Sequence, residues 1–218
     1  MNMIRIGLLV VFPLLSACTA SLPPAETTPD GLVRVPSRPE GGVYRKLDAN
    51  FTGYKRLMIE PLTVEFLEGW RKQHRNVSDT EVRRIQTETS QNFVKVFTDI
   101  FVNEGPFELT EVREADVLVV VPRMLNLKIP APETEADTGY TSSSPRPVSL
   151  EMTGELRDGV NGGVLLRVNM IEPDDAFKTH QIPGPNRLAN AHEIRMSLEK
   201  WSRLVREAID VAKASKPR

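Results

Sequence analysis

Residues 148–171 read VSLEMTGELRDGVNGGVLLRVNMI, and this stretch decides the fold. Apolar and polar side chains alternate through its first part, which is typical of a strand with one buried and one wet face. Segment 158–163 contains three glycines and predicts a turn that Asp158 initiates. A second alternation follows, so we expect an antiparallel hairpin. The side chains expected to point inward are Val148, Leu150, Met152, Leu156, Val164, Leu166, Val168 and Met170.

Two further strands are expected earlier in the chain. Residues 55–66 predict one strand, and Pro61 within it indicates an edge position or a bulge, because proline cannot donate to a sheet. Residues 116–129 predict another, whose apolar run Val117–Val121 suits burial on both faces. The side chains expected to share one face of the earlier strand are Met58, Leu62, Val64 and Phe66.

Two long helices are expected as well. Ser78 and Glu81 form a capping-box pattern, and an apolar stripe with three- and four-residue steps continues from there to Gly105. Asn190 and Glu193 repeat the cap pattern before a last helix that carries Trp201.

These elements predict an α+β fold in two layers. We expect a mostly antiparallel sheet of about four to five strands with two long helices packed on one face. The first strand, the first helix and the second strand can form a parallel crossover. The other sheet face is polar and is free to face water or a partner. Residues 43–214 are expected to be a single domain with mobile loops at 130–146 and 173–189.

The N-terminus predicts export. Arg5 precedes the apolar stretch Leu8–Leu15, and the small residues Ser16 and Ala17 follow, which is the layout of a secretory signal over residues 1–17. The apolar stretch is shorter than the ~20 residues that a membrane-spanning helix needs. Residues 18–42 are rich in proline and predict an extended tether with a reach of roughly 60 to 70 Å.

The residues Leu15-Ser16-Ala17-Cys18 resemble the bacterial lipobox. The resemblance implies cleavage between Ala17 and Cys18, and attachment of diacylglyceryl and palmitate groups to Cys18. Cys18 is the only cysteine, so a disulfide within the chain is excluded. Thr19, in place of an aspartate, favours the outer membrane facing the periplasm, and the inner membrane stays an alternative. An ordinary secretory signal with a coincidental cysteine is the competing interpretation.

Most of the chain resembles a family of uncharacterised bacterial lipoproteins that is catalogued as a domain of unknown function. The resemblance is carried by the lipobox, the tether and the motifs at 54–61, 114–120 and 156–159, together with the late helix around Trp201. It implies the α/β layout above, and it implies no catalytic or binding residues.

Composition and motifs argue against several classes of function. The formal net charge is −1 and no run of basic residues occurs, so a nucleic-acid partner is not expected. A nucleophile elbow, a phosphate-binding glycine loop and a His-Glu-x-x-His motif are all absent from the sequence. We therefore expect no enzyme, cofactor or metal. The polar residues weighed and set aside are a carboxylate pair from Glu151 and Glu155 with Glu60 or Glu65, the surface residue His74, and a metal set of Asp174, Asp175, His180 and His192.

The sequence thus favours a membrane-anchored periplasmic lipoprotein that is a non-enzymatic binding or accessory subunit of an envelope assembly, biosynthesis or transport system. Its partners would be the membrane, through Cys18, and an envelope protein or polymer. Phe66 and Trp70 are the candidate partner surface. A periplasmic hydrolase or metal-dependent enzyme built on residues 173–192, and a lipid or small-molecule carrier with a cleft between sheet and helices, stay open.

Overall fold

A computed structural model describes residues 26–35, 41–130, 148–172 and 187–214. The expected signal, its cleavage site at Ala17 and the lipid-attachment residue Cys18 lie outside these ranges, as do most of the two expected loops.

The described residues form eight strands and three α-helices, with one π-helical turn. In chain order they are β1 Val33–Val35, β2 Gly41–Arg45, β3 Arg56–Ile59, β4 Thr63–Phe66, α1 Trp70–Gln73, α2 Asp79–Thr98, the π-helical turn η1 Asp99–Asn103, β5 Glu108–Leu109, β6 Val117–Lys128, β7 Ser149–Asp158, β8 Val164–Glu172 and α3 Arg187–Ala214.

All eight strands belong to one mixed sheet. The order is β1-β2-β8-β7-β6-β3-β5, and β4 also pairs with β6. The four pairs from β1 to β6 are antiparallel, whereas β3 and β4 run parallel to β6, and β5 runs parallel to β3. The α+β class and the parallel crossover are confirmed. The expectation of four to five mostly antiparallel strands is wrong, because the sheet is larger and mixed.

The extra strands are short, and they form where local pattern is weak. The segment 55–66 divides into β3 and β4 around Pro61, and both halves pair with the long strand β6. The division also shifts which side chains point inward: Leu57 is buried, while Met58 is only partly buried. β1 and the start of β2 lie within the range expected to be tether, so the folded part of the chain begins before residue 43.

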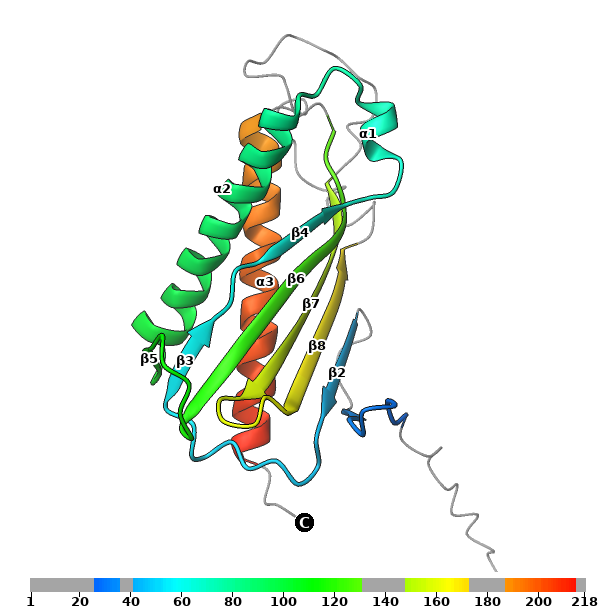
Figure 1. Ribbon diagram of the computed structural model, residues 1–218. Coiled ribbons are helices and arrows are strands. Elements are labelled where there is room, and N and C mark those ends of the chain that lie inside the picture. The colour runs from blue at the N-terminus through cyan, green and yellow to red at the C-terminus, as the bar shows by residue number, and fades with distance from the viewer. Residues whose placement is uncertain (1–25, 36–40, 131–147, 173–186, 215–218) are drawn as a thin grey trace, which may run out of the picture.

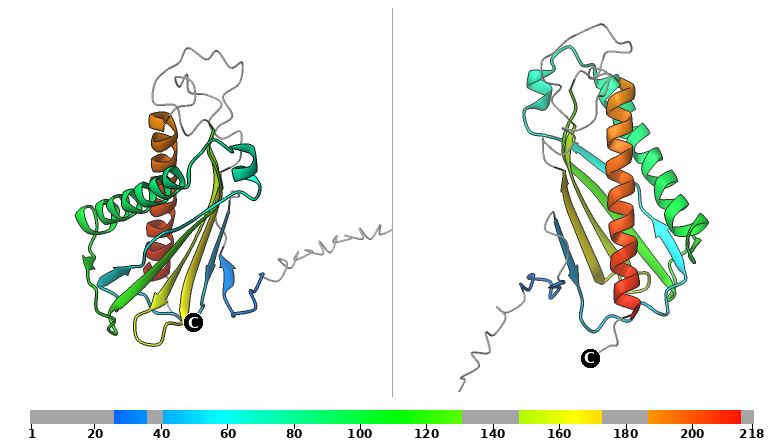
Figure 2. Two further views of the ribbon diagram at one scale, coloured as in Figure 1. Left: turned by 45° about the horizontal axis from the view of Figure 1, so that its top comes forward. Right: turned by 180° about the vertical axis from the view of Figure 1, so that it is seen from behind.

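Two long helices cover one face of the sheet, as predicted (Figures 1 and 2). Trp201 of α3 is fully buried, and its indole Nε1 donates a hydrogen bond to the Val168 carbonyl of β8 at 3.2 Å. Its ring lies 5.9 Å from the ring of Phe93 on α2. These contacts join both helices and the sheet in one core of apolar side chains. No helix among the described residues is long and apolar enough to cross a membrane.

The start of α2 is confirmed. Ser78 is the N-cap residue, and its hydroxyl accepts a hydrogen bond from the Glu81 amide at 3.1 Å. The apolar stripe then packs inward, with Ile85, Phe93 and Phe97 all buried. The helical path continues through η1 and ends before Gly105, as the sequence predicted.

The expected start of α3 is wrong. The helix begins at Arg187, so Asn190 and Glu193 lie inside it and do not cap it. Both side chains are buried, and both form hydrogen bonds with backbone groups beside the sheet strands. Asn190 Nδ2 donates to the Pro130 carbonyl at 2.7 Å, and the Glu193 carboxylate accepts from the Val148 amide at 3.0 Å. These two side chains therefore fix the end of β6 and the beginning of β7 to the first turns of α3.

Candidate functional site

The sheet face turned away from the two long helices is the most extensive candidate site; it faces the viewer in Figure 1. We call it the open face. Strand register aligns its side chains in three rows across β6, β7 and β8. The rows are Leu125, Glu151 and Ile171; Arg123, Thr153 and Asn169; and Val121, Glu155 and Arg167.

Polar side chains on the open face hold one another in place. The Arg167 guanidinium donates to Glu155 from Nε at 3.0 Å and from Nη2 at 2.7 Å, and Arg157 approaches the other oxygen of Glu155 at 2.5 Å. Burial opposes ionisation of Glu155, but the two arginines outweigh it and hold the pKa of this carboxyl below its usual range. Thr153 donates to Asn169 Oδ1 at 2.7 Å. The face is therefore an ordered polar surface.

Apolar side chains run between these polar groups. Val119 of β6 is fully buried and lies outside the main core, and Val121 and Leu125 on the same strand are partly buried. Ile171 of β8 is 52% exposed. The open face therefore combines paired arginines and carboxylates with scattered aliphatic groups, and arginine is one of the residues enriched in protein interfaces.

Residues 26–35 fold against the edge of this face, and we call them the N-terminal arm. The arm is a tight hairpin, because Thr27 bridges Val33 and the Arg34 amide donates to the Glu26 carbonyl at 2.8 Å. Its second half, β1, pairs with β2. At its turn Asp30 forms an ion pair with Arg167 at 2.6 Å, and Leu32 is fully buried.

The prediction that Phe66 and Trp70 form a partner surface is corrected by the structure. Trp70 is 1% exposed, and its indole Nε1 donates to the Ile129 carbonyl at 3.0 Å. It is stacked between Phe66 and His74, with ring centroids 4.5 Å apart on each side. Trp70 therefore closes the end of the core and does not present itself to a partner. The indole N–H can be buried because the Ile129 carbonyl accepts its hydrogen bond.

The carboxylates weighed for catalysis are each engaged in a pair. Glu60 pairs with Arg113 at 2.7 Å and Glu65 with Arg123 at 2.8 Å, while Glu151 accepts from Asn126 at 3.0 Å. Together with Glu155, they act as partners of cations and amides on the surface. Asp158 is the predicted turn former, and its Oδ1 accepts the amides of Val160 and Asn161 at 3.0 and 2.9 Å.

The histidines do not assemble a site within the described residues. His74 is partly buried in the aromatic stack, not the freely solvated residue expected, and His192 is exposed on α3. Asp174, Asp175 and His180 lie outside the described residues. In the described part of the chain, no three His, Cys, Asp or Glu side chains lie close enough together to hold a metal ion.

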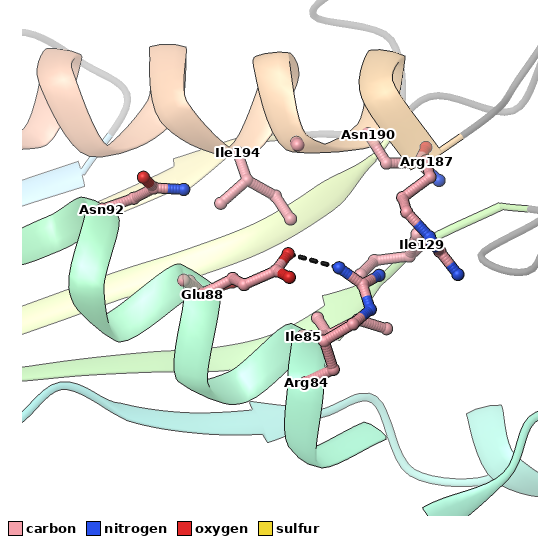
Figure 3. A pocket seen from close by; sticks show the side chains of 10 residues that line it. Arg84, Ile85, Glu88, Asn92, Ile129, Arg187, Asn190 and Ile194 are labelled. Atoms are coloured by element: carbon pink, nitrogen blue, oxygen red, sulfur yellow. Dashed lines mark hydrogen bonds and ion pairs between the residues drawn. The ribbon is translucent and has the colours of Figure 1, made fainter. Parts of the chain in front are cut away.

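A pocket between the first half of α2, after its first turn, and the beginning of α3 is small (Figure 3). Its volume is about 40 Å³, which is room for a few water molecules. Ile85, Ile129 and Ile194 line it, with Arg84, paired to Glu88, at its rim. A lipid or small-molecule carrier needs several hundred Å³ of enclosed apolar space. Apolar side chains of the core occupy the described helix–sheet interface. A larger open hollow of about 540 Å³ lies beside η1 and α3, with the charged residues Arg203, Arg206 and Asp210 among its lining.

Sequence reasoning missed Asp30, Arg167 and the arm to which they belong. A signal was present, since Pro29-Asp30-Gly31 is a strong turn sequence. The prolines on both sides of it are typical of a tether and obscure this turn signal. Gly31 has φ +81°, the left-handed conformation that glycine adopts without strain.

Comparisons with known proteins are weak. No protein-family model and no curated protein matches the chain. Among solved structures, the dodecamer of a single-substitution variant of PelC and the PelC dodecamer, both from Paraburkholderia phytofirmans, are similar at 10% identity, with TM-scores of 0.31 and 0.32. They cover 74% and 72% of this chain and 98% and 96% of their own. A neuraminyllactose-binding hemagglutinin homologue from Helicobacter pylori is similar at 8% identity with a TM-score of 0.33, over 83% of this chain and 97% of its own. Likenesses at these TM-scores carry no argument about function.

Proposed function

We propose that this protein is a lipoprotein of the bacterial cell envelope that binds another envelope component through its open face and catalyses no reaction. Cys18 would carry the lipid, and the domain would work in the periplasm, held to the outer membrane. The proposal extends to an accessory role in envelope assembly, biosynthesis or transport.

The observation that carries the binding role is the open face itself. Three aligned rows across β6, β7 and β8 place arginines, carboxylates and aliphatic side chains on one face of the sheet that neither long helix covers. Pre-ordered side chains lose little freedom on association, so such a face is suited to specific recognition. The partner's surface would be of mixed charge with apolar groups, which fits a protein better than a lipid.

The binding role is tested by photo-crosslinking in living cells. A photoreactive residue at Ile171 on the open face is expected to give a discrete adduct. The same residue at Val94 is the matched control, because Val94 is an aliphatic side chain of α2 that is 40% exposed. Adducts from both positions, or from neither, would contradict a role for the open face.

The lipid anchor is tested separately. Radioactive palmitate should label the wild-type protein, and Cys18→Ala should remove the label, because the chain contains no other cysteine. Equal labelling of the two proteins would show that the lipid-anchor proposal is wrong. The outcome does not depend on whether a binding partner exists.

A further inference from the structure

The N-terminal arm joins the folded domain to the residues that would carry the lipid. The described part of the arm begins at Glu26, and Cys18 precedes it by eight positions. While the arm is docked, at most the seven residues 19–25 separate it from Cys18. At about 3.3 to 3.6 Å per residue this spacer spans at most roughly 25 Å. If the arm leaves the sheet, the spacer extends to residue 40 and spans up to roughly 75 Å.

The contacts that dock the arm are few and lie near the surface. One bidentate ion pair joins the arm to the central part of the sheet, in which Asp30 meets both terminal nitrogens of Arg167 at 2.6 and 3.4 Å. The side chains of this pair are 38% and 24% exposed. Beyond it, the arm is held by the three-residue pairing of β1 with β2, by a hydrogen bond from Arg34 to the Gly41 carbonyl at 3.4 Å, by the burial of Leu32 and by Val35, which packs against the main core. Leu32 does not belong to the main core.

The arm keeps its own shape through internal bonds. The Thr28 hydroxyl accepts from the Leu32 amide at 3.0 Å, and Glu26 pairs with Arg34 at 3.1 Å. An isolated two-stranded hairpin is only marginally stable in water, so these internal bonds also open when the arm leaves the sheet. Local openings of this kind draw on the least stable parts of a fold, where few apolar contacts are buried.

We infer that the N-terminal arm is a releasable clasp, latched by Asp30 and Arg167, that sets how far the domain can stand from its membrane. This inference rests on the proposed lipid anchor at Cys18. Docked, the clasp holds the domain close to the lipid surface. Released, it lengthens the tether by about 15 residues, which adds roughly 50 Å of reach. A partner that competes for Arg167 on the open face would open the clasp.

The first measurement follows the clasp itself. Hydrogen exchange is recorded on the full lipidated chain in detergent, for wild type, Arg167→Gln and Asp30→Asn. In both variants the Leu32 and Arg34 amides should exchange about three- to tenfold faster, the effect of losing one partly exposed ion pair. Asp30→Asn leaves the Arg167–Glu155 pair in place, so it separates the latch from the rest of the network.

Arg123→Gln is the matched control. Arg123 is an open-face arginine paired with Glu65 at 2.8 Å, but it lies on β6, which β7, β8 and β2 separate from β1 of the arm. It should leave arm exchange unchanged. Equal exchange of the arm in wild type, Arg167→Gln and Asp30→Asn would overturn the clasp.

The second measurement follows the distance between the domain and the bilayer. Each protein is placed in vesicles of phosphatidylethanolamine and phosphatidylglycerol, with a dye on Lys95→Cys of α2 and acceptor lipids in the bilayer. Energy transfer should fall in Arg167→Gln and stay at the wild-type value in Arg123→Gln. Faster arm exchange with unchanged transfer would overturn the claim about tether length. Failure of every protein, wild type included, to stay on the vesicles would instead reject the lipid anchor, while the exchange data still report on the latch.

Discussion

Gly154 shows how one residue on β7 sets the position of a helix. A Cβ atom at this position would lie 2.4 Å from Cζ2 and 2.6 Å from Cη2 of Trp201, which is closer than carbon atoms can approach. The Trp201 ring therefore packs directly against the backbone of β7 at Gly154. The requirement is steric and does not depend on the backbone conformation of glycine.

Gly154→Ala should therefore destabilise the protein by about 1 to 3 kcal/mol, the usual cost of overpacking a filled core. Urea unfolding monitored by tryptophan fluorescence gives the value. Trp201→Phe should cost less in the Gly154→Ala protein than in the wild type, because the smaller ring leaves room for the methyl group. Gly53→Ala is the control, since nothing lies within 4 Å of a Cβ at Gly53, and it should be neutral. Equal stabilities for the two alanine variants would contradict this account.

Glu193 is a buried acid with a structural task. Burial raises the pKa of its carboxyl, and the Val148 amide and His192 lower it by less. A folded pKa above the unfolded value means that the protonated form is favoured in the folded state. The resulting contribution to stability is complete below the unfolded pKa and is lost as the pH rises through the folded pKa.

Glu193→Gln keeps an oxygen that can accept from the Val148 amide and removes the ionisation. The wild-type protein should therefore lose stability relative to Glu193→Gln as the pH rises from below 4.5 towards 7. Glu193→Ala should be less stable than both at every pH, because the amide is left unpaired. Urea titrations at a series of pH values test this, with Glu207→Gln on the exposed side of α3 as the control. A difference between wild type and Glu193→Gln that does not change with pH would contradict the assignment.

At the scale of elements, α2 depends on its first turn. Four amides at the start of a helix lack partners, and the Ser78 hydroxyl satisfies one of them at Glu81. Ser78→Ala should cost about 1 kcal/mol in the free energy of unfolding. Thr87→Ala, on the exposed middle of the same helix, should be neutral or slightly stabilising, because alanine is the better helix former. Thermal unfolding of both variants separates the cap from a general effect of alanine.

Strand β6 is the element around which the sheet is organised. It pairs with β7 on one side and with both β3 and β4 on the other, so its residues from Val117 to Val120 are buried on both faces. Near its end the register shifts between Leu125 and Lys128, and Asn126 adopts φ +54°. This bulge lets Leu127 and Ile129 point into the core after the strand has turned.

At the scale of the whole molecule, the core and the arm are separable. The main core joins β2 through α3; Leu32 of the arm stands outside it, and Val35 of the arm is only partly buried against it. A chain that begins at Gly41 should therefore keep its fold and unfold in one transition. Its loss of stability should be about 1.5 to 3 kcal/mol, the worth of one buried leucine side chain. Loss of the near-ultraviolet circular dichroism signal in the shortened protein would show that the arm belongs to the core.

The sequence by itself determined the elements whose signals are local. The cap at Ser78, the stripe of α2, the hairpin of β7 and β8 and the doubly buried run of β6 all follow from side-chain periodicity and turn chemistry, which require no knowledge of distant residues. The sequence is also the sole source of the prediction for Cys18, because the lipobox depends on order along the chain.

Tertiary structure decided everything that depends on residues far apart. β1, β2 and β5 are too short to carry a pattern and exist because a neighbouring strand supplies their hydrogen bonds. Trp70 looked available and is buried, since Ile129, 59 positions away, accepts its N–H. The open face and its latch arise in the same way, because Asp30 and Arg167 are 137 positions apart and meet only when the sheet has formed.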